Sequence, residues 1–225
     1  MNKVNKKAWE GLIFFLAALL LLLFLPAWTI NYWQAWAFWA VFSILVIAIT
    51  VYLMQKDPEL LKRRLSAGPA AERQASQKLI QFVAQFAFVA VIILPPLDHR
   101  FGWSVVPLYL SIAGNILVAL GLYIVFLVFK QNTYTSAIVE VAPEQKVIST
   151  GPYALVRHPM YSGAIIMLLG IPLALGSWWG IVAVIMLSAA IIWRLLDEEK
   201  YLSKNLPGYP AYQSKVLSRL VPFIW

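Results

Sequence analysis

A short polar box interrupts the apolar C-terminal half of the chain. The stretch GPYALVRHPMYSG, residues 151–163, places Arg157 and His158 directly before an apolar run. Further along, RLLDEEK places Arg194 and Glu198 one helical turn apart, at the end of another apolar run. A guanidinium can hold a carboxylate, an imidazole can take up a proton, and a carboxylate can bind a cation. Ionisable groups at the edge of hydrocarbon are costly unless paired, so they indicate a functional site.

Two apolar segments, residues 160–176 and 178–196, must position these side chains. They are joined at GSWWG, and we predict that they form an antiparallel helical hairpin. The polar box before the first helix and the charged run after the second then meet at one end. Each segment is close to the lower length limit for a membrane span, so the hairpin need not cross the membrane fully.

The composition excludes an ordinary soluble domain. The chain has 225 residues, of which 61% are hydrophobic and only 12% charged, whereas soluble domains are nearer half apolar and a quarter charged. The absence of cysteine excludes disulfides, thiolate metal sites and cysteine nucleophiles, and no metal site is predicted. We therefore predict an all-α, polytopic transmembrane helical bundle. Its apolar segments are expected at 9–25, 32–53, 79–97, 104–129, 160–176 and 178–196.

The basic residues indicate an orientation in the membrane. If the N-terminus is cytoplasmic and the segments alternate, seventeen of the eighteen Lys and Arg lie on the cytoplasmic side, and only Arg100 lies outside. Both termini and the active site are then expected to be cytoplasmic. The net charge of +8 is so distributed that it favours contact with anionic membrane lipids over nucleic acid. The second connection supplies Lys56, Lys62, Arg63, Arg64, Arg73 and Lys78.

The chain is expected to have two parts. Residues 1–129 would form about four transmembrane helices with a basic cytoplasmic loop at 54–78. Residues 130–225 would form the catalytic region: a polar connection, the helical hairpin and a C-terminal tail. In that tail Tyr209, Tyr212, Val216 and Leu220 are spaced by three and four residues, which predicts one face of an amphipathic interfacial helix.

Each motif alone has a simpler interpretation. Arg157 with His158 could be a positive-inside anchor, and Arg194 with Glu198 could be a structural ion pair at the end of a helix. GPY could be a plain turn. All these elements, however, occur together in one order and spacing.

That order resembles the isoprenylcysteine carboxyl methyltransferase and phospholipid methyltransferase family of integral membrane enzymes. The resemblance lies in KVISTGPYALVRHPMYSG, two apolar helices, RLLDEEKYL, and then YPAYQSKV followed by RLVPFIW. It implies a methyltransferase that uses S-adenosylmethionine and releases S-adenosylhomocysteine. The cofactor pocket would be made by the hairpin, the connection before it and the tail.

The resemblance also implies roles for particular residues. Arg194 would hold a substrate carboxylate and act as the catalytic and substrate-binding residue. The family often has a histidine where Gln145 stands. The cofactor-binding residues it implies are Gln145, Lys146, Val147, Ile148, Tyr153, His158, Pro159, Met160, Tyr161 and Glu198.

The acceptor is expected to carry a lipid tail, because such a molecule can enter sideways from the membrane. A prenylcysteine-like carboxylate is the first expectation, since it is ionised at pH 7 and needs only a guanidinium to hold it. The alternative is a phospholipid amine, which must lose a proton, to His158 or Glu199. Two other classes remain open: an NADPH-dependent membrane sterol-type reductase, which shares the Arg-His-Pro-x-Tyr box, and a non-enzymatic membrane protein. No obligate protein partner is evident.

Overall fold

The protein is described by a computed structural model that covers residues 2–65, 70, 72, 74–142 and 144–225. Arg73 of the predicted basic loop lies outside the described residues. Within them the chain forms eight α-helices, one 3-10 helix and no strand, which confirms the all-α prediction. The elements are α1 (Lys3–Ala27), α2 (Trp33–Lys56), α3 (Pro58–Arg64), α4 (Ala75–Phe101), α5 (Leu108–Gln131), η1 (Gly151–Ala154), α6 (Pro159–Ala174), α7 (Gly180–Asn205) and α8 (Tyr209–Lys215).

Five helices, α1, α2, α4, α5 and α7, are long and apolar enough to cross a membrane. The shortest have 24 residues, which at about 1.5 Å per residue exceeds a hydrocarbon core of roughly 30 Å. Helix α6 has 16 residues and is close to the lower limit, as expected. The same expectation is wrong for α7, which has 26 residues. Helix α7 continues beyond the apolar residues, through the charged run that contains Glu198, and ends at Asn205.

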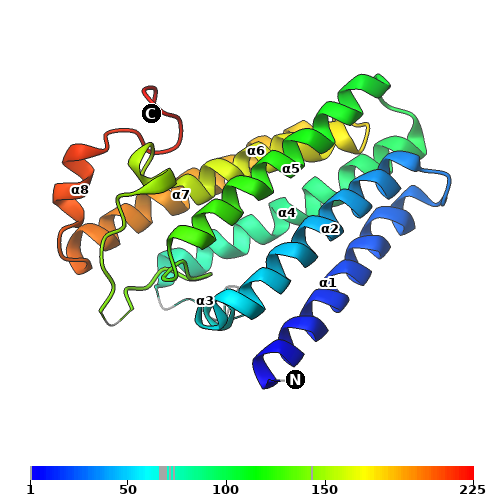
Figure 1. Ribbon diagram of the computed structural model, residues 1–225. Helices are drawn as coiled ribbons and strands as arrows, with labels where there is room; N and C mark the ends of the chain where they lie inside the picture. Colours follow the sequence, from blue (N-terminus) through cyan, green and yellow to red (C-terminus); the bar gives the residue numbers. More distant parts are fainter. Residues whose placement is uncertain (1, 66–69, 71, 73, 143) are drawn as a thin grey trace.

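Helices α1, α2, α4, α5, α6 and α7 lie side by side, and each runs opposite to the one before it in the chain (Figure 1). Their short connections gather at one end of the bundle, at the upper right of the view. The elements α3, η1 and α8 lie at the opposite end, where α4 and α6 begin and α5 and α7 end. The polar motifs predicted from the sequence therefore meet at one end of the bundle.

Glycines hold α6 directly against α5. Gly114 and Gly121 on α5, and Gly163 and Gly170 on α6, are each seven residues apart, so each pair lies on one helix face. A Cβ on Gly121 would lie 2.5 Å from the Gly163 carbonyl oxygen, and one on Gly170 would lie 2.5 Å from that of Gly114. Small residues allow such close backbone approach between membrane helices. This contact fixes the N-terminus of α6, and with it the polar box.

The C-terminal tail differs from the sequence expectation. A tail helix is present, but α8 ends at Lys215, so the predicted face that extended to Val216 and Leu220 is wrong. The chain after α8 pairs instead with the polar box: the Arg157 N–H donates to the Ser218 carbonyl (2.9 Å) and the His158 N–H to that of Arg219 (3.0 Å). The carbonyls of Ser218 and Arg219 thus accept from the polar box and not from N–H groups of a longer tail helix.

Candidate active site

A cavity of about 380 Å³ lies at the end of the bundle where the polar motifs meet. This volume is in the range of small-molecule sites. All eleven residues that the sequence identified line it. They are Gln145, Lys146, Val147, Ile148, Tyr153, His158, Pro159, Met160, Tyr161, Arg194 and Glu198. The walls come from the α5–α6 connection, α6, α7 and α8, and also from α3 and α4 of the predicted N-terminal part.

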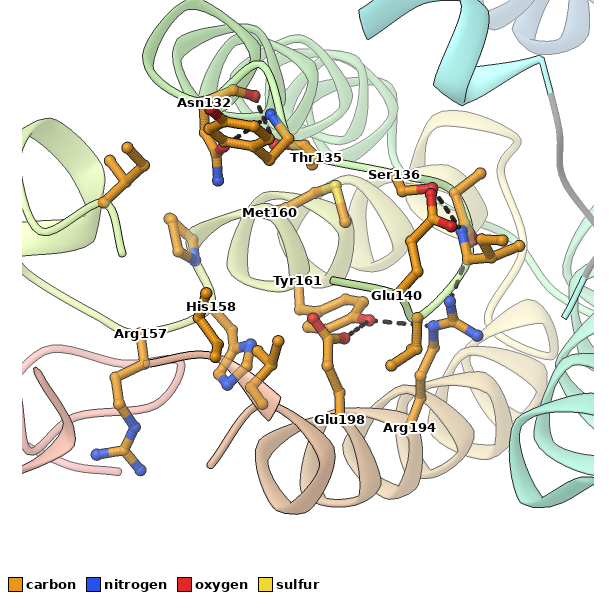
Figure 2. Close-up of a pocket in the computed structure, with 18 of the residues that line it drawn as sticks. Asn132, Thr135, Ser136, Glu140, Arg157, His158, Met160, Tyr161, Arg194 and Glu198 are labelled. Atoms are coloured by element: carbon orange, nitrogen blue, oxygen red, sulfur yellow. Dashed lines mark hydrogen bonds between the residues drawn. The ribbon is translucent and has the colours of Figure 1, made fainter. Parts of the chain in front are cut away.

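Arg157 is buried and has a structural role at the edge of the cavity. Its Nε donates to Glu199 Oε1 at 2.7 Å. Its Nη1 donates to the carbonyls of Val216 and Leu217 at 2.8 and 2.9 Å. Figure 2 shows its guanidinium directed away from Tyr161 and Glu198. Arg157 therefore fastens the tail to α7 and is not a simple positive-inside anchor.

His158 is held in place by the same carboxylate. Its Nε2 lies 3.1 Å from Glu199 Oε1, and Arg219 Nε donates to Glu199 Oε2 at 3.0 Å. Because arginine side chains surround Glu199, its carboxylate acts as an acceptor, and this contact requires the proton on His158 Nε2. A neutral imidazole in this tautomer presents Nδ1 as a proton acceptor. The His158 ring also stacks on Tyr161, with ring centroids 5.8 Å apart.

The Tyr161 hydroxyl connects the two charged residues of α7. It donates to Glu198 Oε2 at 2.5 Å and accepts from Arg194 Nε at 3.0 Å. Figure 2 shows the three side chains converging. The structure contains this three-residue chain where the sequence had suggested a direct pair between Arg194 and Glu198.

The ionic partner of Arg194 is Glu72, from the α3–α4 connection. Arg194 Nη1 lies 2.8 Å from Glu72 Oε1, and the Glu72 side chain is fully buried. Arg194 Nη1 also donates to Gln77 Oε1 at 3.0 Å, and Nη2 donates to the Ala137 carbonyl at 3.1 Å. With the Tyr161 contact, the Arg194 guanidinium makes three hydrogen bonds and one ion pair among the described residues.

Sequence reasoning missed the contribution of the second connection and α4. Arg64, assigned to a basic loop, lines the cavity, donates to the Ser136 carbonyl at 3.1 Å and lies over the Phe129 ring. Gln77 and Gln81 stand one turn apart at the start of an apolar run, and that spacing was an available signal. Glu72 is one of three acidic residues in the predicted basic loop 54–78 and offered no comparable pattern.

Two tyrosines of α8 complete the wall. The Tyr212 hydroxyl donates to the Tyr153 carbonyl at 2.7 Å, whereas the buried Tyr209 hydroxyl has no hydrogen-bond partner among the described residues. Burial raises the pKa of Tyr209, Tyr212 and Tyr153 above the ordinary value, so all three hydroxyls stay neutral donors at pH 7. Tyr209 lines the cavity, so its unpartnered hydroxyl is a candidate donor to a ligand.

Part of the chain is similar to a known protein family. Residues 109–207 match the model of the phospholipid methyltransferase family. No curated protein sequence matches the chain. The matched segment runs from α5 to just beyond α7 and includes every site residue that the sequence identified. Glu72 and Gln77 precede it, and Tyr209 follows it. The match is consistent with the family of membrane methyltransferases that the sequence motifs resemble.

Proposed function

We propose that the protein transfers a methyl group from S-adenosylmethionine to the polar head of a lipid-tailed acceptor. The observation that carries the proposal is the convergence on one cavity of about 380 Å³ of all eleven motif residues, each of which lies in the segment that matches the phospholipid methyltransferase family. The family match supports this function over the reductase and non-enzymatic alternatives. The five long apolar helices support its membrane setting.

The residues in the cavity wall fit the chemical groups of the cofactor. Glu198 would accept from its ammonium group, and the aromatic rings of Tyr153 and Tyr161 would face its cation or adenine. The orphaned Tyr209 hydroxyl would donate to an oxygen or nitrogen of the ligand. When bound, the cofactor would supply an electrophilic methyl group on a sulfonium. The protein would contribute mainly the alignment of acceptor and methyl.

The contacts of Arg194 favour an amine acceptor over the carboxylate expected from the sequence. A carboxylate is gripped best by two parallel N–H groups, but the Arg194 guanidinium already makes three hydrogen bonds and one ion pair among the described residues. The charge of the guanidinium is also offset by Glu72. A phospholipid amine, the alternative from the sequence, needs no such grip. A carboxylate remains the second candidate, because Arg194 does line the cavity.

An amine acceptor needs a group that takes up its proton. We infer that His158 fills this role, because its bond to Glu199 leaves Nδ1 as the basic nitrogen. The acceptor nitrogen would form its new bond to the methyl carbon as the bond from sulfur to that carbon breaks, and the acceptor's proton would pass to His158. Glu199 itself is a less suitable base, since Arg157 and Arg219 both bind its carboxylate.

The charge pattern supports a cytoplasmic active site. The cavity lies at the end of the bundle that carries the basic residues, which the positive-inside rule assigns to the cytoplasm. A water-soluble cofactor would then enter from the cytoplasm. The catalytic region would extend beyond residues 130–225, since Arg64 and Gln81 also line the cavity.

The test is methyl transfer from methyl-labelled S-adenosylmethionine by the purified protein. Vesicles would contain either phosphatidylethanolamine as the amine lipid or a farnesylcysteine-type carboxylate. We expect label in the amine lipid, and a His158→Ala variant should lose that transfer. Label in the carboxylate alone would reverse the choice of acceptor. Label in neither probe nor a total lipid extract, from a folded protein, would refute the methyltransferase proposal.

A further inference from the structure

Glu72 is a buried carboxylate that does not line the cavity, yet it contacts three segments around it. Its Oε1 lies 2.8 Å from Arg194 Nη1 on α7 and accepts from Gln81 Nε2 on α4 at 3.1 Å. Its Oε2 accepts from the Val139 N–H in the α5–α6 connection at 3.1 Å. Both oxygens are therefore engaged, and the residue lies before the family-matched segment.

These contacts decide where the Arg194 guanidinium points. Glu72 and Gln77, neither of which lines the cavity, both contact Nη1, while Nε donates to the Tyr161 hydroxyl. Glu198 stands one turn further along α7, at the spacing where an arginine and a glutamate on one helix can pair directly. In the structure they do not pair, because the Tyr161 hydroxyl lies between them.

Removal of the Glu72 charge would change this balance. A partly buried guanidinium without its carboxylate is unfavourable, so Arg194 would turn to another carboxylate. Glu198 is one turn away on the same helix. A direct Arg194–Glu198 pair would occupy the carboxylate that the proposed function assigns to the ammonium group of the cofactor.

We propose that Glu72 is a positioning residue that holds Arg194 away from Glu198 and so keeps Glu198 available to the cofactor. The inference rests on the proposed function, because it takes Glu198 as the cofactor-binding carboxylate. It adds the α3–α4 connection to the parts of the chain that control cofactor binding.

The test compares S-adenosylhomocysteine binding by calorimetry in Glu72→Gln, Arg194→Gln and the double variant. Glu72→Gln keeps the side-chain shape and should weaken binding roughly tenfold or more, which corresponds to one lost charged contact. The double variant removes the competing guanidinium as well, and its affinity should return to within about threefold of Arg194→Gln alone. A purely structural role for Glu72 predicts no such rescue.

Matched controls separate the possible failures. Glu59→Gln changes an exposed glutamate of α3 and should bind like the wild type. Wild-type affinity in a folded Glu72→Gln variant, or weak binding that the double variant does not rescue, would overturn the positioning role. If Glu72→Gln does not fold, the comparison uses the double variant and Glu72→Asp instead. The double variant buries no unpaired charge. Failure of the wild type to bind would instead refute the proposed function.

Discussion

Removal of the unpartnered Tyr209 hydroxyl is predicted to preserve or raise the stability of the ligand-free protein and to weaken ligand binding. Tyr209 is 4% exposed, and its hydroxyl has no hydrogen-bond partner among the described residues. A buried unsatisfied polar group costs about 1–3 kcal/mol. Tyr209→Phe removes that group and keeps the ring, so the ligand-free protein should be as stable as the wild type or more stable.

Binding should change in the other direction. If the hydroxyl donates to the cofactor, its loss removes a net contribution of about 0.5–1.5 kcal/mol, or roughly a threefold to tenfold loss in affinity. Tyr212→Phe is the matched control, three residues away on the same short helix. Its hydroxyl already donates to the Tyr153 carbonyl at 2.7 Å, so its loss should cost about 1 kcal/mol and lower Tm by about 2–4 °C.

The assay is thermal unfolding without ligand and calorimetry with S-adenosylhomocysteine on both variants in detergent. The expected pattern is normal stability with weaker binding for Tyr209→Phe, and lower stability for Tyr212→Phe. The reasoning would be refuted if Tyr209→Phe lowered the ligand-free Tm as much as Tyr212→Phe while its affinity stayed at the wild-type value.

Three further predictions follow from the packing and the charges. Arg157→Gln breaks a buried ion pair and releases the tail, and should destabilise the protein by about 3 kcal/mol in denaturant or thermal unfolding. Gly121→Ala places a Cβ 2.5 Å from an α6 carbonyl and should cost about 1–3 kcal/mol, whereas Gly11→Ala, with nothing within 4 Å, should be neutral or stabilising. Because the chain has no cysteine, Leu217→Cys in the exposed tail should be labelled only from the cytoplasmic side and Trp103→Cys only from outside, and the reverse pattern would contradict the proposed orientation.

The general architecture could be predicted because it depends on simple periodic and compositional signals. Long apolar runs predicted the long helices, and antiparallel neighbours required that the polar box and the Arg194–Glu198 run meet at one end. Those two facts placed the polar box and the Arg194–Glu198 run at one end, whereas the residues of the connection before the box were proposed from the family resemblance; all eleven line one cavity. The length of α7 was underestimated, because the polar residues after Leu196 continue the helix, and hydropathy alone does not report this.

The choice of partners within the site could not be predicted. The contact between Arg194 and Glu72 joins residues 122 positions apart, and no local spacing brings them together. The i, i+4 rule suggested Glu198 instead, but the Tyr161 hydroxyl separates the two charges. The end of the tail helix also depends on Arg157, because a buried guanidinium needs hydrogen-bond acceptors. The carbonyls of Val216 and Leu217 accept from Arg157. In a longer helix these carbonyls would instead accept from backbone N–H groups of the helix.

The most direct test of the central claim is calorimetric titration of S-adenosylhomocysteine into the purified wild-type protein and Glu198→Gln. The account predicts one site per chain in the wild type and an affinity roughly tenfold to a hundredfold weaker in Glu198→Gln, because a charged hydrogen-bond acceptor is lost. Glu59→Gln, on the exposed surface of α3, should match the wild type. A folded wild-type protein that does not bind the ligand, or a Glu198→Gln variant with undiminished affinity, would contradict the assignment of this cavity.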